Sequence, residues 1–423
     1  MEFFAYYLIF CVATCLALYA ASRRHSSQRH WQLTPEIVMV LSFFLYTSAM
    51  PFSRILWGTE SEGLDNSFIQ THILGIVGLL FGLILARLLQ PPKAREQEEI
   101  PLTSFQCGAL ATIALFMILG YIYYSVGYSL ANMLQPYTFE ASLKSETTSM
   151  DTLIEPATFA LILHCYLSAS ISRTRKPWLN RYVLSVAGLV TGALLLRGER
   201  NHVIILCLPM IAVAFRNRRI PVFKASAAAI AVFVLFSVVA VVRAFGLLSA
   251  NSAPIGSTSM DPMQGELGTS YNVYSIYKAI ASTEEPVYGK TYVVDLGINL
   301  IPHALWPNRP PSTAERFSML FYGTENLTFG LGFSPVVEAM ANFREPGIPF
   351  VFVAFAVGVV MLGNYLRHRG RWGELCYAMM LPMTINWNRI DSNTAFKMFC
   401  VYSAFLVLFS RLLYPPRPRS AIL

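Results

Sequence analysis

Ile301-Pro-His-Ala-Leu-Trp-Pro-Asn-Arg-Pro310 and Gly332-Phe-Ser-Pro-Val-Val-Glu338 both lie in the stretch from Leu247 to Pro346. This stretch is the one long part of the 423-residue chain that lacks the composition of a membrane-spanning segment. Nearly all the rest is apolar sequence of helix length, joined by short basic connections. The contrast predicts a lipid-embedded frame of helices that holds one large loop against the outer face of a membrane.

The composition indicates the same class of protein. The chain is 55% hydrophobic and 13% charged, whereas soluble domains average about 25% charged residues. We therefore expect an all-α polytopic membrane protein. The net charge of +8 does not indicate nucleic-acid binding, because these charges must first be placed relative to the membrane. All seven cysteines fall in apolar stretches, which argues against a disulfide framework and against a cysteine-ligated metal.

The apolar stretches predict about eleven transmembrane helices, since one span needs about 20 mostly apolar residues. Their expected ranges are 3–22, 36–56, 69–89, 104–126, 152–171, 182–196, 201–215, 224–246, 347–366, 374–388 and 394–413. The segments 182–196 and 201–215 are short for full spans and predict a tilted hairpin or a re-entrant pair. The chain then divides into a helix bundle at 1–246, the large loop at 247–346 and C-terminal helices at 347–423.

Basic residues are concentrated in alternate connections between the predicted spans. Of the 32 lysines and arginines, 20 lie in the segments 23–31, 87–99, 172–181, 216–224, 367–374 and 411–423. Because cytoplasmic loops carry the excess of positive charge, these segments are predicted to be cytoplasmic. The N-terminus and the large loop then lie outside, and the C-terminus lies inside.

Within the large loop, Glu266 to Ser282 predicts an amphipathic helix on which Tyr271, Tyr274 and Lys278 share a face. The apolar segment from Ile298 to Trp306 is expected along the membrane surface. These short elements would give the loop a structure of its own above the spans.

A second short helix is predicted from Pro335 to Phe343, with Ser334 as its N-cap. This helix would place Glu338 and Asn342 one turn apart on one face. The two polar side chains would therefore lie together at the start of the C-terminal helices.

The motifs that the sequence lacks restrict the chemistry. It contains no phosphate-binding P-loop, no G-x-G-x-x-G after a strand and no metal-binding H-E-x-x-H. We therefore expect no cofactor and no tightly bound metal. An enzyme on the outer face of a membrane has no ATP supply, so its substrate must arrive already activated. A lipid-linked pyrophosphate is the obvious class of substrate.

Arginines near the outer ends of predicted spans are candidates to hold the diphosphate. Arg197 and Arg200 lie in Leu196-Arg-Gly-Glu-Arg-Asn201, and Arg243 lies within a turn of the outer end of its span. A guanidinium group matches phosphate oxygens in a bidentate way. The alternatives are a structural ion pair, for example with Glu199, or simple snorkelling to the surface.

Three residues are candidates to accept a proton from an attacking hydroxyl, namely Glu266, Glu338 and His303. The alternatives are that Glu338 is a buried structural carboxylate bonded to a nearby arginine, for example Arg344, and that His303 is a packed interfacial residue. The aromatic side chains Tyr271, Tyr274 and Trp306 could stack on sugar rings, or could form the aromatic belt of the membrane surface.

The motifs of the loop resemble those of the Wzy family, the bacterial O-antigen and exopolysaccharide repeat-unit polymerases. The resemblance rests on Tyr288-Gly-Lys-Thr-Tyr292, on Leu300 to Pro310, and on Gly332-Phe-Ser-Pro-Val-Val-Glu-Ala-Met-Ala-Asn-Phe343. Leu196-Arg-Gly-Glu-Arg200 resembles an earlier turn of the family, and Glu266 matches a glutamate near the start of its loop. The chain departs from the family pattern at three positions, His303, Arg309 and Arg344.

The resemblance implies a glycosyltransferase of GT-C-like architecture in the bacterial inner membrane, with its active site facing the periplasm. The growing chain would sit on undecaprenyl pyrophosphate, and the hydroxyl of an incoming lipid-linked repeat unit would attack its anomeric carbon. Arg309 would then be a fourth diphosphate ligand, and Asn342 would contact sugar. The resemblance also implies a chain-length co-polymerase as a partner, with membrane lipid around the helices and no nucleic acid.

Three other functions remain open on the sequence. An O-antigen ligase shares the architecture and the donor but uses a different acceptor. A lipid-linked oligosaccharide flippase or exporter would need a polar path through the helices, and the predicted spans contain few ionisable residues away from their outer ends. A scaffold of an envelope assembly would need none of the candidate side chains.

Overall fold

The computed structural model describes residues 2–23, 33–57, 62–89, 102–125, 148–171, 177–197, 200–215, 268–281, 285–301, 306, 308–311, 316–317 and 333–414. Every regular element in these ranges is helical, which confirms the all-α prediction for this part of the chain. The helices are α1 Glu2–Arg23, α2 Pro35–Trp57, α3 Glu62–Leu88, α4 Ser104–Ser125, α6 Thr148–Ile171, α7 Pro177–Arg197, α8 Arg200–Phe215, α10 Thr269–Ile276, α11 Lys290–Leu300, α13 Pro335–Arg367, α14 Gly370–Asn386 and α15 Ser392–Leu413. A π-helical turn, Tyr277–Ala281, continues α10.

Eight of the described helices are long and apolar enough to cross a membrane, and α8 is a shorter apolar helix. Ten of the eleven predicted spans coincide with a helix, whereas 224–246 falls outside the described residues. The total of eleven therefore stays a prediction. The prediction that 182–196 is short for a full span was wrong, because this segment belongs to the 21-residue helix α7, which is long enough to cross a membrane. The tilted hairpin or re-entrant pair with 201–215 stays a prediction.

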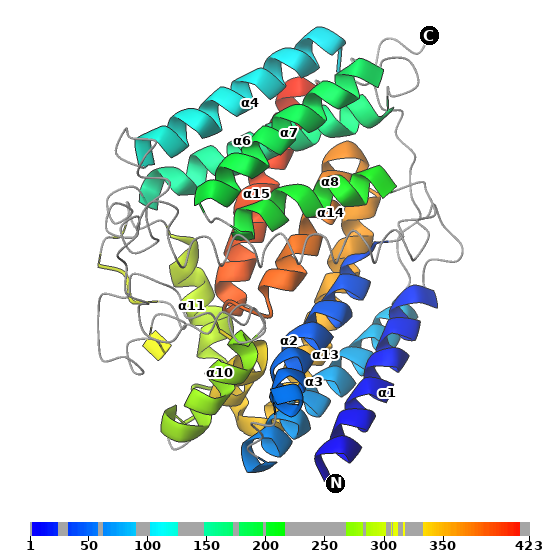
Figure 1. Cartoon of the computed structure of the whole chain (residues 1–423), viewed down its shortest axis with the longest axis vertical. Helices are drawn as coiled ribbons and strands as arrows, with labels where there is room; N and C mark the ends of the chain where they lie inside the picture. Colours follow the sequence, from blue (N-terminus) through cyan, green and yellow to red (C-terminus); the bar gives the residue numbers. More distant parts are fainter. Residues whose placement is uncertain are drawn as a thin grey trace.

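The helices form two groups joined by a central pair (Figure 1). In one group α3 packs against α1 and, most extensively, against α13, with α2 alongside. In the other group α4 packs against α6 and α7. Helices α14 and α15 lie between the groups, since α14 contacts α2, α13 and α8 while α15 contacts α6. The short helices α10 and α11 lie beside the ends of α2 and α15 (Figure 1).

Close approach of backbones holds α3 against α13. A Cβ atom at Gly78 would lie 2.6 Å from the carbonyl oxygen of Pro349, and one at Gly82 would lie 2.7 Å from that of Val353. In lipid, the hydrophobic effect does not drive helices together. Their association depends on close packing, which small residues at such positions allow. The glycines spaced along α3 thus account for the most extensive helix contact in the fold.

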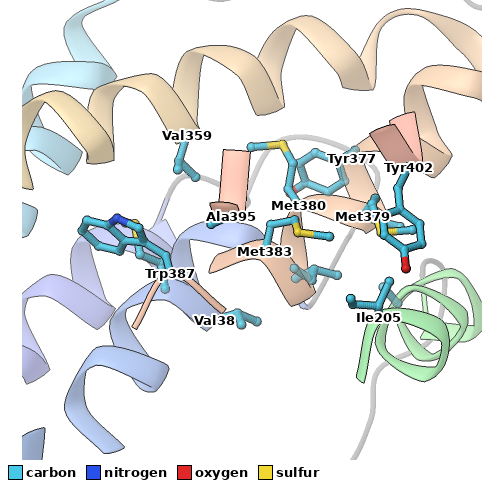
Figure 2. Packing of buried hydrophobic residues seen from close by; sticks show 14 of the residues in the cluster. Val38, Ile205, Val359, Tyr377, Met379, Met380, Met383, Trp387, Ala395 and Tyr402 are labelled. Carbon is cyan, nitrogen blue, oxygen red and sulfur yellow. The ribbon is translucent and has the colours of Figure 1, made fainter. Parts of the chain in front are cut away.

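Helix α14 is buried on nearly all of its faces. Its side chains Tyr377, Met379, Met380 and Met383 pack among residues of α2, α8, α13 and α15 (Figure 2). Unbranched methionine side chains adapt to such irregular gaps. The helix is therefore a central element of the core.

Helix α13 is broken at Arg344, the residue after the Asn342-Phe343 pair. Arg344 has φ 62° and ψ −172°, a conformation that is essentially restricted to glycine. Pro346 lacks the N–H that would bond the carbonyl of Asn342 in a regular helix. Instead the N–H of Tyr288 donates to that carbonyl at 3.0 Å, and the N–H of Val287 donates to Ala341 at 3.1 Å. The break thus joins the segment before α11 to the start of α13.

The break also concerns the predicted boundary between the loop and the C-terminal helices. That boundary, between 346 and 347, lies close to the non-helical Arg344, at which one helical part of α13 ends and a second begins. The short helix predicted from Pro335 to Phe343 is confirmed as the part of α13 that precedes the break.

Replacing Arg344 by glycine should stabilise the protein. Strain of this kind costs about 1–3 kcal/mol, and the extra backbone freedom of an unfolded glycine offsets roughly 0.5–1 kcal/mol of the gain. We expect Arg344→Gly to raise the free energy of unfolding by about 1 kcal/mol, seen as a higher Tm in detergent. Arg344→Ala, which removes the side chain but keeps the strain, is the matched control. A glycine variant no more stable than the alanine variant would contradict a strained backbone.

Candidate active site

Glu338 lies in the first turn of α13 and is fully buried. The predicted helix start is confirmed, since Ser334 is the N-cap residue and Pro335 begins the helix. The side chain of Ser334 makes no capping hydrogen bond, however. Asn342 lies one turn further along and is also fully buried. The expected pairing of Glu338 with Asn342 is therefore present, and both lie inside the protein.

Both oxygens of the Glu338 carboxylate accept hydrogen bonds from other elements. The hydroxyl of Thr291, in α11, donates to Oε1 at 3.1 Å. The backbone N–H and the hydroxyl of Ser392, at the start of α15, donate to Oε2 at 3.0 and 2.7 Å. A buried carboxylate is costly unless it is satisfied in this way. These donors come from Thr291 and Ser392, while the guanidinium of Arg344 contacts the hydroxyl of Tyr277 at 3.5 Å.

The donors to Glu338 are themselves held in place. Asn342 Nδ2 donates to the Thr291 hydroxyl at 2.7 Å, and Asn393 Nδ2 donates to the Thr291 carbonyl at 2.6 Å. The indole N–H of Trp387 donates to the Ser392 hydroxyl at 2.9 Å. Two short hydrogen-bond chains therefore converge on the carboxylate, one from α11 and one from the connection that precedes α15.

That connection, which we call the 386–393 turn, joins several helices. The carbonyl of Arg389 accepts from the N–H of Phe333 at 2.7 Å, and its guanidinium donates to the side chain of Asn201 at 2.9 Å. The carbonyl of Asn388 accepts from Ser270 at 3.3 Å, while its side chain donates to Ser42 at 2.9 Å. The turn thus connects the starts of α8, α10 and α13 to α2.

The arginine candidates are only partly described. Arg197 ends α7 and Arg200 begins α8. The bond from Arg389 to Asn201 brings the start of α8 beside the 386–393 turn. Arg309 donates to the carbonyls of Ile301 at 3.1 Å and Asn299 at 3.4 Å. Its side chain therefore caps the C-terminal end of α11. Arg243, together with the proton-acceptor candidates Glu266 and His303, lies outside the described residues.

Tyr271 and Tyr274 lie on one face of α10 with Lys278, as the helical spacing predicted, since the Lys278 ammonium lies 5.8 Å from the ring centre of Tyr274. Both rings are buried, with 3% and 0% of their surface exposed. The Tyr271 hydroxyl contacts Asp65 and Arg54. In this conformation neither ring presents a face to a sugar, whereas Trp306 is 39% exposed.

The Tyr274 hydroxyl also has a partner on the neighbouring span, because it lies 2.6 Å from the hydroxyl of Ser67. The ring packs edge-on against Phe68 at 5.3 Å. Its tyrosines therefore fix helix α10 to the end of α2 and to the start of α3.

Thr291 and Tyr292 lie in the Tyr288–Tyr292 motif but were given no role from the sequence, and the 386–393 turn was not predicted at all. A signal for the turn was present, because Asn386-Trp-Asn-Arg-Ile-Asp-Ser-Asn393 places a run of polar residues between two apolar helices. Burial and the charge of Glu338 raise the pKa of Tyr292 well above its ordinary value. The phenol therefore stays protonated and remains a hydrogen-bond donor at neutral pH.

Among the residues that the structure describes, no group of three histidine, cysteine, aspartate or glutamate side chains is placed to hold a metal ion. The groups nearest the Glu338 carboxylate are hydroxyls, amides and backbone N–H groups. The arrangement suits the binding of a neutral polar molecule beside a carboxylate.

Comparison with known proteins gives one match. The family model described as O-antigen polysaccharide polymerase Wzy matches residues 2–414, nearly the whole chain. No curated protein matches, and no solved structure matches. The match covers the described helices together with Glu338, Thr291 and the 386–393 turn. The chain belongs to the Wzy family of O-antigen polysaccharide polymerases, which polymerise lipid-linked repeat units into polysaccharide.

Proposed function

We propose that Glu338 accepts the proton of the sugar hydroxyl that attacks the growing chain during polymerisation. The observation that carries this proposal is the convergence of α11, α13 and α15 on one buried carboxylate. A general base must be held within hydrogen-bond reach of the proton it removes. The fixed donors around Glu338 give its carboxylate a defined position of this kind.

The bonds, electrons and proton of the reaction can then be accounted for. The acceptor oxygen forms a bond to the anomeric carbon of the growing chain, and the bond from that carbon to the lipid pyrophosphate breaks. The pair of electrons of the broken bond leaves with the diphosphate, and the hydroxyl proton passes to Glu338. Glu266 and His303 are the alternative proton acceptors in the large loop.

The leaving diphosphate needs positive charge. We assign this role to Arg197, Arg200, Arg243 and Arg309, because guanidinium groups bind phosphate oxygens in a bidentate way. The bond from Arg389 to Asn201, at 2.9 Å, supports the assignment for Arg200, since it brings the start of α8 near the turn that holds Ser392. Trp306 and Asn342 are the proposed sugar contacts, whereas the buried rings of Tyr271 and Tyr274 hold α10 against α2 and α3.

Access to Glu338 requires movement, because its side chain is fully buried. Helix α11 covers the carboxylate through Thr291 and is tied to α15 by the bond from Asn393. Displacement of α11 would break these two bonds and open Glu338 to an acceptor. Such closure over the substrate also keeps water from the reaction.

The remaining assignments concern the setting of the reaction. We propose that the carrier lipid is undecaprenyl pyrophosphate and that the site faces the periplasm from the bacterial inner membrane. A chain-length co-polymerase would bind the chain there. The arginines, in place of a metal ion, would neutralise the charge of the leaving diphosphate.

Removing the charge of Glu338 should abolish polymerisation. A general base contributes typically about 10²–10⁴-fold to a rate. We expect Glu338→Gln, in a deletion strain at matched protein level, to yield single repeat units where the wild type yields a ladder on a polysaccharide gel.

Glu36→Gln is the matched control for the loss of a buried carboxylate. Glu36 is 1% exposed and lies at the start of α2, near Arg367 at the end of α13. Glu338 lies at the other end of α13. This variant should retain the ladder. A normal ladder with Glu338→Gln would rule out Glu338 as the base and leave Glu266 and His303.

Chelation should not stop the reaction. If arginines neutralise the diphosphate, purified protein given lipid-linked repeat units should polymerise them at an unchanged rate in excess EDTA. Loss of activity in EDTA and its recovery with Mg²⁺ would show instead that a metal binds the leaving group.

The orientation can be tested by labelling in intact cells. Tyr288, just before α11, is 78% exposed, and Arg369 is exposed between α13 and α14. In a cysteine-free background, Tyr288→Cys should react with a membrane-impermeant maleimide, and Arg369→Cys should react only after lysis. The reverse pattern would place Glu338 toward the cytoplasm.

A further inference from the structure

Among the buried polar groups around Glu338 that lack a hydrogen-bond partner in the described part of the chain, two lie on α11 and α13. One is the hydroxyl of Tyr292, and the other is Oδ1 of Asn342. The orientation of the Asn342 amide is fixed, because its other end must donate to the Glu338 carbonyl at 2.8 Å and to Thr291 at 2.7 Å. The unpaired end is therefore a carbonyl oxygen, which can only accept.

Such groups are costly to the free protein. A buried donor or acceptor without a partner costs about 1–3 kcal/mol, and most buried polar groups in proteins are paired. Here a donor and an acceptor are both unpaired, on two elements that meet at Glu338. The pair is explained if a ligand supplies the missing partners.

Packing fixes the Tyr292 ring, with no hydrogen bond from its hydroxyl. The ring stacks on Phe343, with ring centres 6.4 Å apart and planes 12° apart. Phe343 is held in turn by Gly289, which has φ +82° and where a Cβ atom would lie 3.1 Å from the Phe343 ring. The hydroxyl thus has a set position and is available to bind.

The charges around the two groups select the kind of ligand. The Glu338 carboxylate and the Asn342 carbonyl oxygen both repel anions, so a diphosphate is disfavoured here. A sugar hydroxyl suits the site, because it accepts a hydrogen bond from one neighbour and donates to another. Thr291 and Ser392 are already engaged with Glu338, so the unpaired groups are the ones left for the ligand.

We propose that Tyr292 and Asn342 form the subsite for the acceptor sugar, in which the Tyr292 hydroxyl donates to one sugar oxygen and Asn342 Oδ1 accepts from a sugar hydroxyl. This inference rests on the proposed role of Glu338, because it places the attacking sugar beside that carboxylate. It assigns Tyr292 to substrate binding and leaves the diphosphate to the arginines.

The test compares binding with stability in Tyr292→Phe, which removes the unpaired hydroxyl and keeps the stacked ring. The purified full chain in nanodiscs is given lipid-linked repeat units extracted from a strain that lacks this polymerase. We expect the KM for the repeat unit to rise about tenfold, as for the loss of one hydrogen bond. The Tm without substrate should stay equal or rise, because an unsatisfied buried group has been removed.

Tyr414→Phe is the matched control, since the Tyr414 hydroxyl already has a partner in Ser168 at 2.9 Å. It should lower the Tm and leave the KM unchanged. An unchanged KM in Tyr292→Phe would overturn the subsite. A lower Tm with an unchanged KM would show that the hydroxyl binds an internal water only.

The outcomes of these experiments distinguish failure of the subsite from failure of the proposed role of Glu338. If Tyr292→Phe has a normal KM while Glu338→Gln is inactive, the subsite is wrong and the role of Glu338 stands. If Glu338→Gln polymerises normally, the role of Glu338 is wrong, and the subsite, which rests on it, falls with it.

Discussion

A carboxylate removed from water must be given hydrogen-bond donors, and Glu338 receives them from two elements far away in the chain. Ser392 is 54 residues from Glu338 and supplies two donors, and Thr291 is 47 residues away and supplies the third. The large loop is therefore joined to the membrane helices at this carboxylate. Thr291 also binds Asn342 and Asn393, so one loop residue connects α13 to α15.

The sequence predicted the local features of this arrangement well. Apolar runs predicted the helices, and the spacing of Glu338 and Asn342 predicted their shared face. Both features depend only on residues that are close in the sequence. The meeting of Glu338 with Ser392 and Thr291 depends on which outer connections come together. Periodicity carries no information on that point. The same limit explains Tyr271 and Tyr274, whose shared face was predicted while their buried partners on α2 and α3 were not.

The family match decides among the functions that the sequence left open. A ligase, an exporter and a scaffold all fit a helical frame with a large outer loop, and no physical feature of the loop separates acceptors. The match over residues 2–414 selects the polymerase. The helices alone fix much less, since fold does not imply function. The chemistry must therefore be argued from the side chains at the site.

A polymerase of this kind must bind a neutral nucleophile and an anionic leaving group at the same time, and these need opposite charges around them. The cluster at Glu338 presents acceptor oxygens, which suit a hydroxyl and repel a phosphate. Positive charge lies elsewhere, at Arg389, whose guanidinium contacts Asn201 near the start of α8. The 386–393 turn carries both Ser392, which binds Glu338, and Arg389. We propose that this one connection sets the distance between the attacking oxygen and the departing diphosphate, because displacement at the anomeric carbon requires the two to be held in a defined geometry.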